Sequence, residues 1–456
     1  MGKSLLFVPR MWTQLEKHRH IFAKIFVSII FAGITYRLFF NRSLTFSDPG
    51  SESHQLQASP SSNPYQLDRS PYADTQNNDN QASSDNEGRG KIEPDDKMEE
   101  QKSGAQTQTE KCNLFSGKWI PNPSEPIYNN VSCPIVQGHQ NCMKNGRPDS
   151  GYLYWRWKPR DCELPSFNPN KFLNSMRNKA LAFIGDSISR NQVESLVCLL
   201  SVEAAAIEYY HDEEYKSKKW MFSPYNFTLA VIWSPFLLHA EINEDQNGVS
   251  KSIIQLHLDV LDKKWTDEYR NFDYIVTSGG KWFLKAAIYR EKNAQVGCHH
   301  CQRKDLTEFG IEYAYRKALR ATFDFFNRSD YKGMLILRTS TPDHFENGEW
   351  SNGGICKRTV PFREGEVSLI DVDRTLRNIE LEEFQIAANF SKYELKLLDT
   401  THLSLLRPDG HPGPYRQFHP FAQDKNAKVQ NDCLHWCLPG PIDSWNDILM
   451  KMILDR

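Results

Sequence analysis

Short apolar runs alternate with helical patterns from about residue 171 onward, and this alternation limits the possible folds more than any other feature. The runs with the length and continuous apolar character of buried strands are residues 180–184, 229–233, 253–258, 274–277, 334–337 and 395–398. The spacing of apolar residues predicts helices between several of them, notably over residues 189–200, 312–326 and 444–454. Such a pattern is typical of a mainly parallel sheet covered by helices on both faces. The sequence therefore predicts a three-layer α/β domain.

This domain accounts for only part of the 456 residues. Residues 41–110 are rich in Ser, Asn, Gln, Asp and Pro, with scarcely any aliphatic residue. Such a segment cannot bury enough apolar surface to offset its ordering entropy, so we interpret it as a disordered lumenal stem. Residues 111–170 contain four Cys and several turn signals, and their apolar residues show little periodicity. This predicts a loop-rich cap segment that disulfides attach to the domain over residues 171–456.

The N-terminus carries a candidate membrane segment. Residues 21–40 are almost all apolar, and a run of about 20 such residues can span a bilayer if Lys24 and Arg37 reach the two interfaces. Four Lys or Arg residues and one Glu lie in residues 1–20, so the positive-inside rule predicts a cytosolic tail and a lumenal domain. We interpret the run as a single-pass type II signal anchor. A cleaved signal peptide is the alternative, although the bulky residues 36–40 offer no small-x-small cleavage site.

All ten cysteines lie beyond residue 111. An even number confined to one region suggests disulfides and an oxidising compartment, whereas buried free thiols in a cytosolic enzyme are the alternative. Sequons for N-glycosylation in the same region favour the lumenal interpretation. Their acceptor residues are Asn130, Asn226, Asn327 and Asn389.

Two kinds of partner are not expected. The chain has 55 Lys and Arg against 57 Asp and Glu, a net charge of −2, so no global positive field would draw it to nucleic acid. The run Cys298-His299-His300-Cys301 contains zinc-ligand residue types, but no second ligand pair at standard spacing follows. Two thiols in an oxidising lumen more often form a disulfide or pair elsewhere, so we expect no metal site.

The first chemical motif is Gly185-Asp186-Ser187, at the end of the predicted strand over residues 180–184. A serine at this junction projects from the carboxyl edge of the sheet, where ligands bind in such folds, and its backbone N–H points the same way from the helix N-terminus. One turn can thus supply a nucleophile and an oxyanion donor. A simple helix N-cap is the alternative.

The second motif is Asp432-Cys433-Leu434-His435, near the C-terminus. On a helical turn this spacing sets the carboxylate beside the imidazole, so Asp432 can orient the histidine that accepts the serine proton. A surface Asp and a capping His form the alternative. Cys433 and Cys437 favour the catalytic interpretation, because they would fix the segment covalently. With Ser187, the two motifs predict a triad in the chain order Ser, Asp, His.

These motifs carry a resemblance to a known family. The matching segments are residues 154–159 (YWRWKP), 185–192 (GDSISRNQ) and 432–440 (DCLHWCLPG). With them the chain resembles the SGNH (GDSL-type) esterase superfamily and, within it, the plant trichome birefringence-like family of polysaccharide O-acetyltransferases. The resemblance covers the whole folded part, and the predicted anchor and stem also fit it. It implies a Golgi type II membrane enzyme with Ser187, His435 and Asp432 as its triad.

The resemblance also implies a reaction. An acetyl donor, with acetyl-CoA as a candidate co-substrate rather than a bound cofactor, would acylate Ser187, and a hydroxyl of a hemicellulose would accept the acetyl group. Variants of the motifs at residues 156–159, 278–283 and 297–301 favour xyloglucan or glucomannan over xylan as the acceptor. An acetyl esterase with water as acceptor and a non-catalytic wall-polymer binding protein are the alternatives.

Four disulfides follow from the resemblance rather than from spacing. They are Cys112–Cys162, Cys133–Cys198, Cys142–Cys437 and Cys356–Cys433. The last two would tie the segment of Asp432 and His435 to the cap segment and to a distant loop.

The sequence lacks the Gly-x-Asn-Asp segment that supplies an oxyanion donor in the esterases of this superfamily. Gly279 and Gly280 follow the predicted strand over residues 274–277, and their backbone N–H groups can approach an acyl oxygen closely. An ordinary strand-end turn is the alternative. Arg190, one helical turn beyond Ser187, is expected to neutralise charge near the site, or else to pair on the surface.

Aromatic residues near these motifs predict a sugar-binding groove. Aromatic side chains pack on the apolar face of a pyranose ring, and polar groups form hydrogen bonds with its hydroxyls. The candidates in or beside the motifs are Trp155, Trp157, Trp282 and Trp436. For each of them, burial in the core is the alternative.

Overall fold

The computed structural model describes residues 112–243 and 251–455. The predicted tail (1–20), anchor (21–40) and stem (41–110) lie outside the described residues and stay predictions. Within the described ranges, no helix combines the length and the apolar character needed to cross a bilayer.

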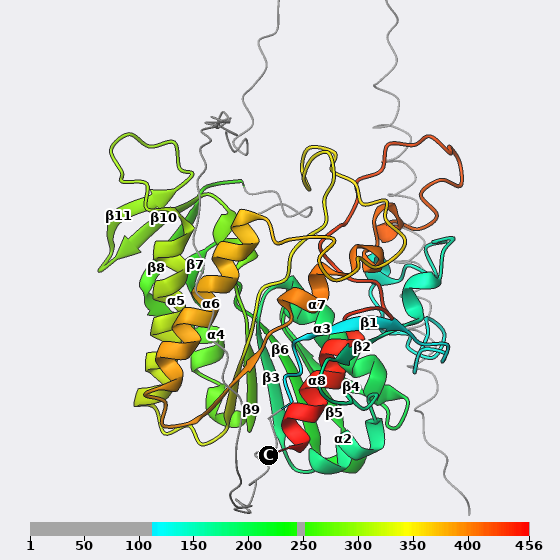
Figure 1. Ribbon diagram of the computed structural model, residues 1–456. Helices are drawn as coiled ribbons and strands as arrows, with labels where there is room; N and C mark the ends of the chain where they lie inside the picture. The colour runs from blue at the N-terminus through cyan, green and yellow to red at the C-terminus, as the bar shows by residue number, and fades with distance from the viewer. Residues whose placement is uncertain (1–111, 244–250, 456) are drawn as a thin grey trace, which may run out of the picture. The chain divides into compact units, whose positions relative to one another are not determined.

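A seven-stranded sheet in the order β13-β12-β9-β3-β6-β5-β4 forms the centre of the fold (Figure 1). Its strands are β3 (Ala180–Gly185), β4 (Ile207–His211), β5 (Lys218–Phe222), β6 (Phe227–Trp233), β9 (Tyr274–Thr277), β12 (Met334–Arg338) and β13 (Glu394–Leu398). The strands from β13 to β6 run parallel, whereas β5 and β4 pair antiparallel. The sheet is therefore mixed, with the predicted parallel arrangement at its centre.

Both faces of this sheet are buried, as β3 illustrates. Leu181 and Phe183 point into one hydrophobic core, and Ala182 and Ile184 point into the other. Because successive residues of a strand face opposite sides, a strand buried on both faces reads as a continuous apolar run. This explains why the sequence pattern located the central strands.

Helices cover the two faces and complete the three layers (Figure 1). The first core contains residues of α2 (Pro169–Ser175), α3 (Ser187–Ser201), α7 (Thr401–Leu405) and α8 (Asp443–Leu454). The second core contains residues of α4 (Lys263–Thr266), α5 (Gly310–Arg328) and α6 (Asp371–Ala388). The three predicted helices are present as α3, α5 and α8, while α6 was not predicted.

A second sheet, in the order β11-β10-β8-β7, lies beside α5. Its strands are β7 (Leu238–Glu241), β8 (Ile254–Leu261), β10 (Ala287–Glu291) and β11 (Ala294–His299). Assigning residues 253–258 to the main sheet was wrong, because they form β8 here. Ile254 and Leu256 of β8 are buried while Gln255 and His257 are not, an alternation typical of a strand with one solvent-facing side.

The cap segment contains a small antiparallel sheet of β1 (Gly117–Pro121) and β2 (Trp155–Pro159). The remainder of the cap segment is turns and short 3₁₀ helices, including Gly138–Gln140. Disulfide Cys112–Cys162 lies within the cap segment, and Cys133–Cys198 anchors the segment to α3.

Candidate active site

The turn between β3 and α3 places Ser187 at the carboxyl edge of the main sheet. Gly185 ends β3, and a Cβ atom there would lie 2.5 Å from Oγ of Ser189 and 2.8 Å from the carbonyl oxygen of Ser278. Only glycine fits without displacing these neighbours. Ser187 is the first residue of α3, so it lies at the positive end of a 15-residue helix.

Asp186 is the N-cap of α3, as the simpler interpretation of the motif proposed. Its side chain accepts a hydrogen bond of 3.0 Å from the backbone N–H of Ile188. Burial raises the pKa of Asp186, while the buried guanidinium of Arg338 opposes that shift. Capping and catalysis are compatible here, because Asp186 caps the helix and leaves the Ser187 hydroxyl free to meet another partner.

That partner is His435. Oγ of Ser187 lies 2.8 Å from Nε2 of His435, and Nδ1 of the same ring lies 2.9 Å from Oδ2 of Asp432. An ionised carboxylate only accepts hydrogen bonds, so Nδ1 carries the ring proton and Nε2 is able to accept the proton of Ser187. The structure thus brings the three predicted residues together in one hydrogen-bonded chain.

Burial and charge tune the pair of Asp432 and His435. Burial alone would raise the pKa of Asp432, but His435 and the hydrogen bonds from its ring and backbone lower this pKa well below its usual value. Burial alone would lower the pKa of His435, but the Asp432 carboxylate outweighs it and raises this pKa above 6.5. Asp432 therefore stays ionised and stabilises the imidazolium that forms when His435 takes a proton.

The segment from Asp432 to His435 is not the helical turn that the spacing suggested. It is an irregular bend in which Oδ1 of Asp432 accepts from the backbone N–H groups of Leu434, at 3.2 Å, and His435, at 2.9 Å. A short Asp side chain forms such bonds readily in a turn. The bend sets carboxylate and imidazole side by side, as a helix would.

Disulfides hold this bend at Cys433, which lies within it, and at Cys437, two residues after it. The structure contains the four pairs that the resemblance implied, among them Cys142–Cys437 and Cys356–Cys433. A fifth links Cys298 to Cys301, and no cysteine is free. The thiols of the Cys-His-His-Cys run are therefore consumed in a disulfide and are not available as zinc ligands.

Asn191 joins the two halves of the site, a role that the sequence analysis missed. Its Oδ1 accepts from the backbone N–H of Trp436 at 2.7 Å, and its Nδ2 donates to the Trp436 carbonyl at 3.3 Å. Asn191 lies on α3 and Trp436 directly follows His435, so this pair of bonds fixes His435 relative to Ser187.

Three further side chains surround His435, and they too were missed. The His139 ring meets it edge-on at a centroid distance of 6.1 Å, and burial, with a smaller effect of His435, lowers the pKa of His139 to about 4. The Trp350 ring lies 6.2 Å from His435, and the Arg416 guanidinium sits 4.6 Å from the Trp350 ring centre. These residues are scattered through the sequence, and no local pattern marks them.

The residues proposed to support the oxyanion have other contacts. A Cβ at Gly279 would lie 3.1 Å from the Tyr315 ring, and one at Gly280, whose φ is +116°, would lie 2.8 Å from Cβ of Ser340. Close packing explains both glycines, and donation to an oxyanion stays a prediction. Arg190 donates a 3.0 Å bond to Oε1 of Gln137, so it holds the cap segment beside His139.

The proposal of four sugar-binding tryptophans is wrong for two of them. Trp157 is 1% exposed and donates from Nε1 to the Leu114 carbonyl, and Trp436 is 0% exposed and stacks on His411. Fully buried rings cannot contact a polysaccharide. Trp155 and Trp282 are half-buried, and sugar binding by them stays a prediction.

The predicted glycosylation sites lie on the described part of the chain. Asn226 and Asn389 are exposed, whereas Asn130 and Asn327 are half-buried. Glycan attachment stays a prediction.

Comparison with known proteins places this site in a family. Residues 164–452 match the GDSL/SGNH-like acyl-esterase family found in Pmr5 and Cas1p, and residues 110–163 match the PMR5 N-terminal domain. Trichome birefringence-like protein 25 of Arabidopsis thaliana is 58% identical over 361 residues, covering 77% of this chain and 79% of that protein. Xyloglucan O-acetyltransferase 2 of Populus trichocarpa and xyloglucan O-acetyltransferase 1 of Arabidopsis thaliana are each 44% identical, over 75% of this chain and 82% and 80% of theirs. The chain therefore belongs to the GDSL/SGNH-like acyl-esterase family and, within it, to the plant trichome birefringence-like proteins.

Proposed function

We propose that this protein is a Golgi O-acetyltransferase that transfers acetyl groups to hydroxyls of a hemicellulose through an acetyl-Ser187 intermediate. The observation that carries the proposal is the chain of contacts from Ser187 through His435 to the buried carboxylate of Asp432. A serine that donates to an imidazole, itself oriented by a carboxylate, is the arrangement that activates a hydroxyl for acyl transfer.

The first half-reaction acylates the enzyme. Oγ of Ser187 attacks the carbonyl carbon of the acetyl donor while Nε2 of His435 takes the hydroxyl proton. The tetrahedral intermediate then collapses, the bond to the donor's leaving group breaks, and the leaving group receives the proton from His435. Asp432 stabilises the transient imidazolium, and the N-terminal end of α3 favours the negative charge on the former carbonyl oxygen. Acetyl-CoA, whose leaving group is a thiol, is the donor that we propose.

The second half-reaction releases the acetyl group to the acceptor. A sugar hydroxyl gives its proton to Nε2 of His435 and attacks the acetyl-Ser187 carbonyl, and the proton then returns to Oγ of Ser187 as the ester bond breaks. The half-buried Trp350 beside His435 offers an aromatic face on which a pyranose ring can pack. We assign Trp350 to the acceptor in place of the buried Trp157 and Trp436, in addition to the candidates Trp155 and Trp282.

The proposed acceptor is xyloglucan or glucomannan. Support comes from the 44% identity to two proteins named xyloglucan O-acetyltransferase and from the sequence variants described above. The near-zero net charge suits an uncharged polysaccharide. Xylan is the comparison acceptor in the test below.

The proposed location is the Golgi membrane, with a cytosolic N-terminus and a lumenal active site. Five disulfides and four sequons support a lumenal domain. Protease treatment of sealed microsomes tests the topology, since a lumenal domain is protected until detergent is added. Digestion of the domain in intact microsomes would contradict it.

The test of the reaction uses the full-length protein in detergent, acetyl-CoA, and oligosaccharides of xyloglucan, glucomannan and xylan. We expect acetylated xyloglucan or glucomannan by mass spectrometry and, without acceptor, an acetylated peptide containing Ser187. Ser187→Ala should abolish both products. Ser201→Ala is the matched control, because Ser201 lies at the other end of α3 and its hydroxyl donates to the Val197 carbonyl of the same helix.

The same experiment separates the alternatives. Free acetate without acetylated sugar would identify an esterase, which the acyl-esterase family match makes the second candidate. Sugar binding without any acetyl product, unchanged in Ser187→Ala, would identify a non-catalytic binding protein and overturn the proposal.

A further inference from the structure

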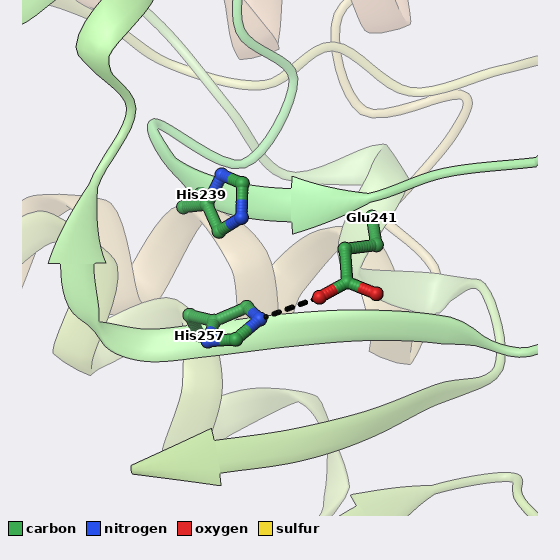
Figure 2. A group of neighbouring side chains, drawn as sticks. All are labelled: His239, Glu241 and His257. Carbon is green, nitrogen blue, oxygen red and sulfur yellow. Dashed lines mark hydrogen bonds and ion pairs between the residues drawn. The ribbon is translucent and has the colours of Figure 1, made fainter. Parts of the chain in front are cut away.

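Two histidines and a glutamate meet on the second sheet, outside the site described above. His239 and Glu241 lie on β7, and His257 lies on the adjacent β8 (Figure 2). Nε2 of His257 is 3.1 Å from Oε1 of Glu241, and the two imidazole rings are 4.8 Å apart between centroids. One ligand atom of each residue lies within 4.8 Å of the other two.

The strands themselves produce this convergence. His239 and Glu241 are two residues apart on β7, so their side chains project from the same face. β8 runs antiparallel to β7, with Glu241 opposite Gln255 and Ala240 opposite Leu256, which places His257 next to them. The pairing shifts register between Leu238 and Ala240, at His239 itself. The backbone therefore fixes the positions from which the three side chains project.

The geometry suits a divalent metal ion. Zinc binds imidazole nitrogen and carboxylate oxygen at about 2.0–2.2 Å in a tetrahedron, so neighbouring ligand atoms lie roughly 3.3–3.5 Å apart. The separation between His257 and Glu241 is already close to this value, and the exposed His239 side chain can rotate to complete the set. Glu241 is also exposed, so water has access to a fourth position.

The residue types select the class of ion. Imidazole ligands favour zinc and its first-row neighbours, whereas calcium and magnesium prefer a set made of oxygen atoms. Two imidazoles and one carboxylate therefore point to a zinc-type cation. We propose that His239, Glu241 and His257 bind a Zn²⁺ ion that bridges β7 and β8.

A bridging ion would hold the edge strand β7 to β8. β7 is an edge strand of four residues whose pairing with β8 is interrupted by the register shift. A metal that joins His239 and Glu241 to His257 would fasten this strand across that irregularity. The inference does not depend on the proposed acetyl transfer, and its test does not use that activity.

The chain supplies a matched control in another histidine–carboxylate pair. Nδ1 of His211 lies 3.1 Å from Oε1 of Glu208, the same separation as in the proposed site, and His211 is also exposed. The structure groups no third metal-ligand side chain with this pair among the described residues. It has one imidazole and one carboxylate, so any zinc affinity it has should be much weaker.

The experiment is calorimetric titration of ZnCl₂ into the full-length protein, purified in detergent without a polyhistidine tag and stripped with a chelator. We expect one tightly bound Zn²⁺ per chain and much weaker binding of CaCl₂. His239→Ala, His257→Ala and Glu241→Gln should each weaken zinc binding by at least about 100-fold, the upper end of the loss seen for residues that only support a metal ligand. His211→Ala should leave the affinity unchanged.

Cobalt(II) supplies a second readout. Bound in a tetrahedral set, it should give visible absorption bands that Zn²⁺ then displaces, and the bands should be lost in His257→Ala but not in His211→Ala. The proposal is wrong if the triple variant of His239, Glu241 and His257 binds zinc as tightly as the parent. It is also wrong if His211→Ala weakens binding as much as His257→Ala does.

Discussion

Two histidine–carboxylate pairs in this protein have similar contacts and different surroundings. In the active-site bend, Nδ1 of His435 lies 2.9 Å from Oδ2 of Asp432, and on the second sheet, Nε2 of His257 lies 3.1 Å from Oε1 of Glu241. The Asp432 side chain is 0% exposed, whereas that of Glu241 is 61% exposed. The first pair is held by disulfides and by Asn191 on α3, and the second by two neighbouring strands.

The difference shows that burial and neighbouring residues decide what a histidine–carboxylate pair can do chemically. Burial makes the interaction of Asp432 with His435 strong, which raises the pKa of the imidazole and fixes its orientation toward a single hydroxyl. On the second sheet, solvent reaches the Glu241 carboxylate, and His239 lies within reach as a third ligand. The buried pair is suited to proton transfer and the partly exposed pair to metal binding.

The largest expected effect is the loss of acetyl transfer when Ser187 or His435 is replaced. Ser187→Ala and His435→Ala should each lower acetyl transfer by roughly 10³-fold or more, since members of such a triad act as a unit. For the same reason the double variant should be no slower than either single variant. Initial rates with acetyl-CoA and xyloglucan oligosaccharides measure this, with circular dichroism to show that the variants are folded. A folded Ser187→Ala protein near the parent rate would exclude an acyl-enzyme.

The next effect is a loss of stability when a disulfide is removed. We compare Cys142–Cys437, which clamps the bend of His435, with Cys298–Cys301 on the second sheet. Cys142 and Cys437 are 295 residues apart, whereas Cys298 and Cys301 are 3 apart. A disulfide stabilises chiefly by restricting the unfolded chain, and more so for a longer loop. Replacing the first pair with Ser should lower the free energy of unfolding by about 2–4 kcal/mol and replacing the second by less.

Urea unfolding followed by tryptophan fluorescence measures both disulfide variants. Only the loss of Cys142–Cys437 should also reduce transfer, because this bond holds the bend of His435. Equal losses of activity from the two replacements would argue against a clamp specific to the active site.

A third prediction measures both zinc binding and acetyl transfer in a variant of each pair. His257→Ala should weaken zinc binding by at least about 100-fold and leave the rate of acetyl transfer unchanged, while His435→Ala should do the reverse. Calorimetry and rate assays on the same two preparations decide it. Loss of transfer in His257→Ala with zinc present would show that the two sites are coupled and that the two pairs do not act independently.

The smallest expected effect is on the pH dependence. His435 acts as a base only when neutral, and its pKa lies above 6.5, so kcat/KM should rise with pH through a point above 6.5. Asp432→Asn removes the charge that raises this pKa while burial, which lowers it, remains. The acid limb should therefore move to lower pH, at a reduced maximal rate.

Glu241→Gln is the control for this profile, because Glu241 pairs with His257 rather than with His435. It should leave the acid limb in place. An acid limb that does not move in Asp432→Asn would mean that another group titrates.

Local patterns were sufficient to predict the centre of the fold and the three residues that meet in the candidate active site. The six predicted strands are present, and β9 has the predicted bounds, because strands buried on both faces form continuous apolar runs. Ser187 was predicted from its turn, and Asp432 and His435 from their spacing. The half-exposed β8 was misplaced, and the strands β1, β2, β4, β5, β7, β10 and β11 were not predicted, because polar residues interrupt the apolar run on which the strand predictions relied. The helices α2, α4, α6 and α7 were not predicted either.

What the sequence determined by itself is therefore what neighbouring residues encode: a glycine turn after a buried strand, a helix N-cap, and an Asp and a His three residues apart. Only the tertiary structure decided which distant groups meet. It brought His435 to Ser187 across 248 residues, placed Trp350 beside His435, and buried Trp157 and Trp436. It also placed His257 of β8 next to His239 and Glu241 of β7. Strand pairing and core packing set these contacts, and both depend on the folded chain as a whole rather than on any local segment.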